Sequence, residues 1–195
     1  MTQISIWTPK GGVGKTMLAL QLAASFSKDN ARVLVVDHDP QAGALIFSRI
    51  AQQQNHTLPF VVSNAMCQGF DITIHDFSPA MVEDLPSRIV VMPTLLDAAS
   101  FLLFTRGKAV AQELGKVVIP VGTRYRADRA EQRALAINHF DSGLVVKDRA
   151  VYANTFGKGQ SVYDSHMAYA QHAQAEINAV ASAIKDIIQP ARRAA

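Results

Sequence analysis

Apolar residues recur along the chain with two different spacings, and the two spacings alternate. Short apolar runs are typical of strands in a parallel sheet. They occupy residues 4–7, 32–36, 58–62, 70–76, 88–93, 116–121 and 143–147. Between them, apolar residues at helical spacing predict helices, chiefly at 15–28, 43–53, 95–114 and 163–188. This alternation predicts an α/β protein with a doubly wound, mainly parallel sheet and helices on both faces.

Length and composition favour one domain spanning residues 1–195. The chain has 195 residues, of which 49% are hydrophobic, enough for a single substantial core. No apolar run approaches the roughly 20 residues that cross a bilayer, and the N-terminus lacks a secretion signal pattern. Cys67 is the only cysteine, so no internal disulfide can form. We therefore expect a cytoplasmic protein in which Cys67 is a small buried side chain.

A glycine-rich segment, Thr8–Thr16, separates the first predicted strand from the first predicted helix. Strand, glycine loop and helix in this order are the context of a phosphate-binding loop. The glycines let successive backbone N–H groups turn toward an anion, and the helix start adds its positive end. In such a loop Lys15 reaches the β- and γ-phosphates and the Thr16 hydroxyl binds Mg²⁺. The predicted nucleotide-binding residues here are Lys10, Gly11, Gly12, Val13, Gly14, Lys15, Thr16 and Met17.

The sequence KGGVGKT at Lys10–Thr16 resembles the deviant Walker A motif of the ParA/MinD family of P-loop ATPases. Met17 departs from that family, which usually has a second threonine there. The resemblance implies a three-layer α/β/α fold with ATP and Mg²⁺ as cofactors. It also implies a homodimer that encloses ATP, in which Lys10 crosses the interface to the partner's phosphates. Lys10 and Lys15 are therefore predicted catalytic residues.

Carboxylates follow two of the predicted strands, at the edge where parallel sheets bind their ligands. Asp37 and Asp39 lie in DHDPQ, which resembles the family's Asp-x-Asp-Pro-Gln signature, and Asp76 ends a strand that resembles Walker B. The resemblance implies that Asp39 positions the attacking water and is catalytic, and that Asp76 holds Mg²⁺ through a water. Asp37 would support the Mg²⁺ shell together with Thr16. The residues alone leave open that Asp37 only caps the next helix.

The helix predicted at 95–114 follows the strand 88–93. We expect Thr94 to cap this helix and Asp97 to lie in its first turn. Most of its residues near the N-terminus are apolar, in a stripe wide enough for the core alone or for an additional dimer or partner face. Core packing is the default interpretation.

Gly122–Arg124 follows the strand 116–121, where the family places a short turn beside the adenine. The resemblance implies that Arg124 contacts the base of the nucleotide or closes its pocket. The sequence contains no Asn/Thr-Lys-x-Asp motif of the kind that reads guanine. Adenine is therefore favoured over guanine.

Basic residues are concentrated in the second half of the chain. Residues 1–115 contain eight basic and nine acidic residues, and the remainder contains eleven and seven. On a helix, Arg126, Arg129 and Arg133 would share one face, which suits a phosphate backbone, although a solvated face would look the same. ParA-type members of the family bind DNA non-specifically, so the resemblance favours DNA. Arg149 and Lys158 join these candidate DNA contacts.

The last predicted helix argues against a membrane partner. Its bulky residues form an ordinary core stripe, unlike the lysine-lined amphipathic helix with which MinD-like proteins bind membranes. These residues are Ile177, Val180, Ile184, Ile187 and Ile188.

The resemblance covers nearly the whole chain and is greatest to compact plasmid-type ParA proteins. It implies an Mg²⁺-dependent ATPase that hydrolyses ATP to ADP and phosphate and drives plasmid or chromosome partition. The ATP-bound dimer would bind DNA non-specifically in the nucleoid, and a ParB-like centromere-binding protein would stimulate hydrolysis. An alternative is an adaptor that uses ATP as a switch to position a protein cargo.

Overall fold

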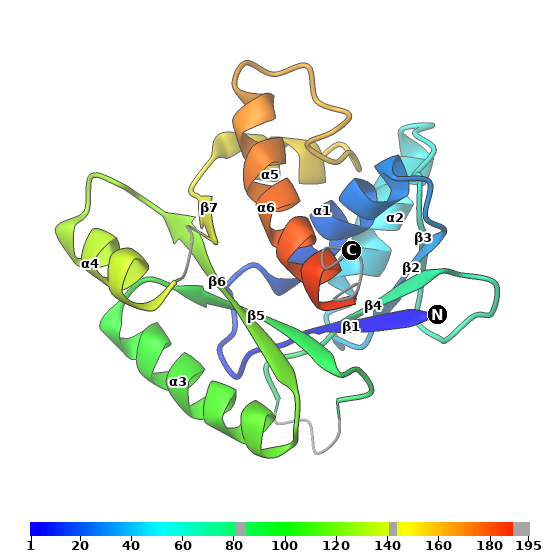
Figure 1. The fold of residues 1–195 in the computed structure, drawn as a ribbon. Helices are drawn as coiled ribbons and strands as arrows, with labels where there is room; N and C mark the ends of the chain where they lie inside the picture. The colour runs from blue at the N-terminus through cyan, green and yellow to red at the C-terminus, as the bar shows by residue number, and fades with distance from the viewer. Residues whose placement is uncertain (81–84, 141–143, 189–195) are drawn as a thin grey trace, which may run out of the picture.

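The computed structural model describes residues 1–80, 85–140 and 144–188. Its centre is a seven-stranded sheet in the order β3-β2-β4-β1-β5-β6-β7, and every neighbouring pair of strands in it is parallel (Figure 1). The strands are β1 (Thr2–Ile6), β2 (Val33–Asp37), β3 (Val61–Ser63), β4 (Ile72–Asp76), β5 (Ile89–Leu95), β6 (Val117–Tyr125) and β7 (Val145–Lys147). The predicted parallel α/β fold is confirmed, and β3 lies at an edge of the sheet.

Helices cover both faces of the sheet (Figure 1). They are α1 (Lys15–Lys28), α2 (Gly43–Gln53), α3 (Ala98–Glu113), α4 (Ala130–His139), α5 (Ala150–Phe156) and α6 (Ala170–Ile188). The larger core joins α1, α2, α5 and α6 to one face of the sheet, where alternate strand residues such as Ile4 and Val35 are fully buried. The opposite face packs Trp7 and Met92 against Phe104 of α3. Alternation along the strands thus supplies apolar residues to two separate cores.

Helix α1 occupies the range predicted for it, Lys15–Lys28. It is buried on most of its surface because it lies against the sheet on one side and against α6 on another. Leu18, Leu22 and Phe26, at helical spacing, are at most 1% exposed. This central position fixes the start of α1, and with it Lys15, at the carboxyl end of β1.

Two predicted helix starts are wrong. Thr94 lies within β5, because that strand continues to pair with β6 as far as Leu95. Helix α3 therefore begins at Ala98, and Asp97 caps it by accepting a hydrogen bond from the Ser100 backbone N–H at 2.9 Å. Helix α6 begins at Ala170 rather than at residue 163.

The segment before α6 is a turn held by polar side chains. The Asp164 carboxylate accepts hydrogen bonds from the backbone N–H and the hydroxyl of Ser161, at 2.9 and 2.7 Å. Such local bonds compete with helix formation, which explains the later start of α6. Cys67 also differs from expectation, because it lies exposed in the loop between β3 and β4.

The stripe predicted on α6 is confirmed as core. Ile177, Val180 and Ile184 are fully buried, and Ile187 and Ile188 pack against them with partial exposure. Among the helices of the described residues, none has the length and hydropathy needed to cross a membrane.

Candidate nucleotide-binding site

The glycine loop connects β1 to α1 in a conformation that requires glycine at two positions. Gly12 and Gly14 have φ angles of 73° and 92°, which side chains disfavour. Val13 between them is fully buried, and its carbonyl accepts a 2.7 Å hydrogen bond from the Thr123 hydroxyl of β6. The same hydroxyl lies 3.1 Å from the Thr94 carbonyl of β5. The loop is therefore fixed to the carboxyl ends of two strands.

Two adjoining cavities flank this loop. The phosphate-loop cavity, of about 260 Å³, is lined by Gly11, Gly12, Gly14, Lys15, Thr16, Met17, Asp39, Gln41, Pro79 and Arg124. The β7 cavity, of about 280 Å³, is lined by Val13, Gly14, Met17, Thr123, Arg124, Val146, Lys147, Asp148, Arg149, Tyr152, Ala153 and Phe156. Gly14, Met17 and Arg124 line both cavities. The two cavities therefore adjoin one another, and the β7 cavity is the more apolar of the two.

Lys15 brings a buried positive charge to the phosphate-loop cavity. The residue is 7% exposed, and its ammonium group donates a hydrogen bond to the Lys10 carbonyl at 3.2 Å. Burial lowers the pKa of Lys15, and the charges of Asp76 and Asp39 partly oppose this change. An anion entering the cavity would compensate the buried ammonium.

Asp76 is fully buried, and neither of its carboxylate oxygens has a hydrogen-bond partner among the described residues. Burial raises its pKa to about 7. The nearby Thr16 hydroxyl, although not in good hydrogen-bond geometry, lowers the pKa of Asp76, and so does the charge of Lys15. The negative charges of Asp37 and Asp39 raise it. An unsatisfied buried carboxylate is costly unless a ligand compensates it.

Mg²⁺ fits this carboxylate if the phosphates of a nucleotide supply further ligands. Carboxylate and hydroxyl oxygens are the donors that Mg²⁺ prefers, and it usually retains waters and phosphate ligands. Among the described residues, no group of three or more His, Cys, Asp or Glu side chains could hold a metal ion by itself. Asp76 and Thr16 are thus suited to a metal that enters with the nucleotide.

Asp37 makes the bonds expected of a helix cap. One of its carboxylate oxygens accepts from the Asp39 backbone N–H at 3.1 Å, and the other accepts from the backbone N–H groups of Ala44 and Leu45, at 2.9 and 3.1 Å. The capping interpretation is therefore favoured over a direct metal contact. Asp39 lines the phosphate-loop cavity, where its carboxylate accepts a 2.9 Å bond from the Gln41 N–H.

Lys10 lies at the start of the glycine loop and is half-buried. Its side chain is not part of the lining of either cavity. The structure shows only that its carbonyl receives the Lys15 ammonium. Its role toward a second subunit stays a prediction.

Arg126, Arg129 and Arg133 do not share one helix face as predicted. Helix α4 begins at Ala130, so Arg126 lies in the preceding turn and Arg129 occupies the cap position. The turn is held by side chains of α4: Gln132 accepts from the Arg126 backbone N–H, and the Arg133 guanidinium donates to the Ala127 carbonyl, both at 2.7 Å. All three arginine side chains are nevertheless exposed on one turn and the helix that follows it.

The other predicted basic contacts are in different surroundings. Lys158 is exposed after α5. Arg124 is exposed on β6 with a φ of 50°, at an irregularity in the pairing with β7, and borders both cavities. Arg149 is largely buried against Glu176 and forms part of the wall of the β7 cavity. Its surroundings suit a structural ion pair better than a DNA contact.

Sequence reasoning missed the residues that shape the apolar half of the site. Tyr152 and Phe156 lie four residues apart on α5 and face the β7 cavity. Their helical spacing was a signal that could have marked them. Glu176, which contacts this wall from α6, is 27 residues from Arg149, and nothing in the sequence pairs the two.

A pair of histidines, also not predicted, links the ends of β2 and β4. His38 and His75 share a hydrogen bond of 2.9 Å between ring nitrogens, and the other nitrogen of His75 lies 3.2 Å from the Gln3 side-chain oxygen. Burial lowers the pKa of both histidines, that of His75 to about 4. His38 also stacks on Phe77, with ring centroids 4.5 Å apart.

Comparison with known proteins gives a consistent family. The model of the CobQ/CobB/MinD/ParA nucleotide binding domain matches residues 4–184. Maintenance of carboxysome distribution protein A of Gloeobacter kilaueensis is 29% identical in an alignment of 152 residues that covers 68% of this chain and 65% of that protein. Chromosome partitioning protein ParA of Myxococcus xanthus is 54% identical over 41 residues, 21% of this chain and 14% of that protein. The chain thus spans just under two thirds of the first relative.

Solved structures with the same fold include proteins with different cellular tasks. A putative plasmid partition protein from Borrelia burgdorferi, bound to AMPPNP, has a TM-score of 0.71 and 17% identity, over 94% of this chain and 99% of that one. A complex of Cyanothece McdA with ATP has a TM-score of 0.75 and 14% identity, over 95% and 96%. MinD from Pyrococcus horikoshii with Mg-ADP has a TM-score of 0.69 and 14% identity, over 96% and 97%. At these identities the likeness shows the fold alone.

Proposed function

Because the chain belongs to the CobQ/CobB/MinD/ParA family of nucleotide-binding domains, we propose that it is an Mg²⁺-dependent ATPase that dimerises on ATP. The observation that carries this proposal is the combination of Lys15 and Asp76 at the glycine loop. One is a buried cation without an anion to compensate it fully, and the other is a buried carboxylate without a partner among the described residues. Mg²⁺ with a nucleotide polyphosphate would supply both missing charges.

The chemistry proposed is hydrolysis of ATP to ADP and phosphate. The loop N–H groups and Lys15 bind the β- and γ-phosphates. Thr16 and Asp76 would hold Mg²⁺, which would supply positive charge beside the transferred phosphoryl group. Asp39 lines the same cavity and accepts a hydrogen bond from the attacking water. Lys10 of a second subunit adds positive charge to the γ-phosphate.

The β7 cavity is the proposed site for the base and ribose. It adjoins the phosphate-loop cavity through Gly14, Met17 and Arg124, so a nucleotide could extend from one to the other. Tyr152 and Phe156 give it aromatic surface on which a base can stack. The base proposed is adenine.

For the cellular role, we propose DNA partition. The exposed Arg126, Arg129, Arg133 and Lys158 supply positive charge for non-specific contact with phosphate groups, and a ParB-like partner would stimulate hydrolysis. A second candidate is the positioning of a protein cargo. It is favoured by the relative with 29% identity over 152 residues, which is a carboxysome distribution protein.

The first experiment measures ATP hydrolysis with Mg²⁺ for the wild type and Lys15→Ala. Loss of the buried ammonium should abolish nucleotide binding and turnover. Unchanged turnover in this variant would contradict the proposed site.

A mobility shift with random-sequence DNA then separates the two cellular roles. Partition on DNA predicts binding that requires ATP, weakens steeply with salt and is lost when Arg126, Arg129 and Arg133 are replaced by alanine. Arg88→Ala is the matched control, because Arg88 is exposed at the opposite end of the strands. An active ATPase that binds no DNA would instead support the positioning of a protein cargo.

A further inference from the structure

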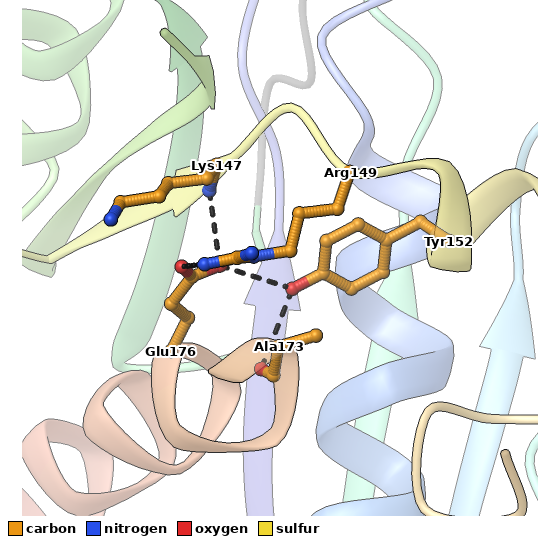
Figure 2. A network of polar contacts seen from close by, with 5 residues as sticks. All are labelled: Lys147, Arg149, Tyr152, Ala173 and Glu176. Atoms are coloured by element: carbon orange, nitrogen blue, oxygen red, sulfur yellow. Dashed lines mark hydrogen bonds and ion pairs between the residues drawn. The ribbon is translucent and has the colours of Figure 1, made fainter. Parts of the chain in front are cut away.

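One carboxylate of α6 holds three residues of the β7 cavity wall (Figure 2). Glu176 accepts a 2.6 Å hydrogen bond from the terminal nitrogen of Arg149, and the Nε of Arg149 lies 3.2 Å from both Glu176 oxygens. The Glu176 carboxylate also accepts hydrogen bonds from the backbone N–H of Lys147 at 3.1 Å and from the Tyr152 hydroxyl at 3.5 Å. That hydroxyl lies 3.4 Å from the Ala173 carbonyl as well.

This cluster is largely shielded from water. The side chains of Arg149 and Glu176 are 22% and 14% exposed, and Tyr152 is 8% exposed. Hydrogen bonding to Glu176 raises the pKa of Arg149, and burial raises the pKa of Tyr152. Fork-like arginine–carboxylate pairs fix geometry, and removing one partner leaves the other charge uncompensated. The pair therefore holds Arg149 in one orientation.

The residues of this cluster lie at different depths relative to the β7 cavity. Lys147, Arg149 and Tyr152 line the β7 cavity, whereas Glu176 and Ala173 do not. Glu176 therefore contacts the residues of the cavity wall from the α6 side, and Figure 2 shows its side chain extending from this helix toward Lys147 and Arg149. None of these contacts involves a residue of the phosphate-loop cavity.

We propose that Glu176 is a positioning residue for the base half of the nucleotide site. It holds Arg149 and Tyr152 so that the β7 cavity keeps the shape that accepts a nucleoside. This inference rests on the proposed function, which assigns that cavity to base and ribose. It also gives Arg149 a role in nucleotide affinity in place of the DNA contact suggested by the sequence.

The proposal predicts which part of the nucleotide is affected. Glu176→Gln keeps the size of the side chain and removes its charge, so Arg149 loses its anchor. We expect the Kd values for ATP and ADP to rise roughly tenfold, since the loss of a charge-assisted pair is involved. Binding of inorganic tripolyphosphate, which has no base, should change less than twofold. KM for ATP should rise with Kd, and kcat at saturating ATP should fall less than twofold.

A matched control keeps α6 as the common element. Asp29→Asn breaks the ion pair in which Lys185 of α6 contacts Asp29 at 2.5 Å, remote from both cavities. It should leave all three affinities unchanged. Equal losses in the control and in Glu176→Gln would show that only the anchoring of α6 matters, and would overturn the proposal.

A double-mutant cycle tests whether Glu176 acts through Arg149. Because Glu176 also holds Tyr152, the ATP affinity lost in the double variant Arg149→Gln with Glu176→Gln should be smaller than the sum of the losses in the two single variants, and additive losses would overturn the proposal. If Glu176→Gln does not fold, Glu176→Asp keeps the charge and shortens the reach. It should raise the Kd for ATP several-fold without changing that for tripolyphosphate.

Failure of this inference can be distinguished from failure of the proposed function. If the wild type binds ATP no more tightly than tripolyphosphate, the β7 cavity does not hold the base. The proposed function and the positioning role of Glu176 are then both refuted. If the wild type prefers ATP but Glu176→Gln binds it equally well, only the positioning role is refuted.

Discussion

Replacing Asp76 with asparagine should stabilise the nucleotide-free protein while removing its response to Mg²⁺. Asp76 is fully buried and its oxygens have no hydrogen-bond partner within the described residues. In the proposed function this cost is offset only when Mg²⁺ and nucleotide are bound. Asparagine has nearly the same shape and carries no charge, so it removes the cost in the free protein and the metal contact in the bound one.

The magnitude follows from the pKa of Asp76, which burial raises from 3.8 to about 7. A folded state with the higher pKa binds the proton more tightly than the unfolded state. Stability therefore declines as pH rises from about 4 to about 7 and is level above that range. At about 1.4 kcal/mol per pKa unit, the raised pKa of Asp76 costs the free protein up to about 4 kcal/mol at pH 8, where the folded carboxylate is ionised, and about 2 kcal/mol at pH 5, where it must take up a proton on folding.

Thermal unfolding of the free protein at the two pH values provides the assay. For a chain of this length, about 4 kcal/mol corresponds to an increase in Tm of roughly 10 °C for Asp76→Asn at pH 8, and to about half of that at pH 5. Mg-ATP should raise the Tm of the wild type more than that of the variant. Asp39→Asn is the control: Asp39 is partly exposed and hydrogen-bonded to the Gln41 N–H, so no comparable gain is expected. A variant less stable than the wild type at pH 8 would show that the buried carboxylate does not destabilise the free protein.

Three further predictions concern the dimer, the hydrolytic step and the fold. Lys10→Ala should bind ATP normally and remain monomeric by light scattering; a variant that still dimerised would refute the role across the interface. Asp39→Ala should accumulate an ATP-bound dimer with at least a hundredfold lower turnover, as expected for loss of a group that orients water, and normal turnover would contradict that role. Gly159→Ala should lose about 3 kcal/mol in urea unfolding, because φ is 61° and an added Cβ would lie 2.2 Å from the Ala51 backbone nitrogen. Gly157→Ala, where the nearest atom would be 3.7 Å away, should be nearly neutral.

The sequence was sufficient where a function depends on a short, continuous segment. The glycine loop needs its glycines, Lys15 and Thr16 within a few residues, and the strand before it and the helix after it were visible in the apolar pattern. Asp76 was placed by the same logic, because the carboxyl end of a parallel strand must face the ligand edge. Its burial without a partner could not be foreseen, since this depends on the packing of neighbouring elements.

Predictions failed where distant residues determine the local structure. Thr94 has the chemistry of a helix cap, yet pairing with β6 keeps it in a strand. Arg126 lies at helical spacing from Arg129, yet the Gln132 side chain holds it in a turn. Arg149 looked like a free basic residue because its partner is far away in the sequence.

If two copies of this chain enclose two molecules of ATP, the mass of the protein in solution must depend on the nucleotide. Light scattering with Mg²⁺ and saturating AMPPNP should give twice the mass measured without nucleotide, and removal of the nucleotide should restore the monomer. A protein that remains monomeric while nucleotide binding is confirmed in the same sample would contradict this dimer.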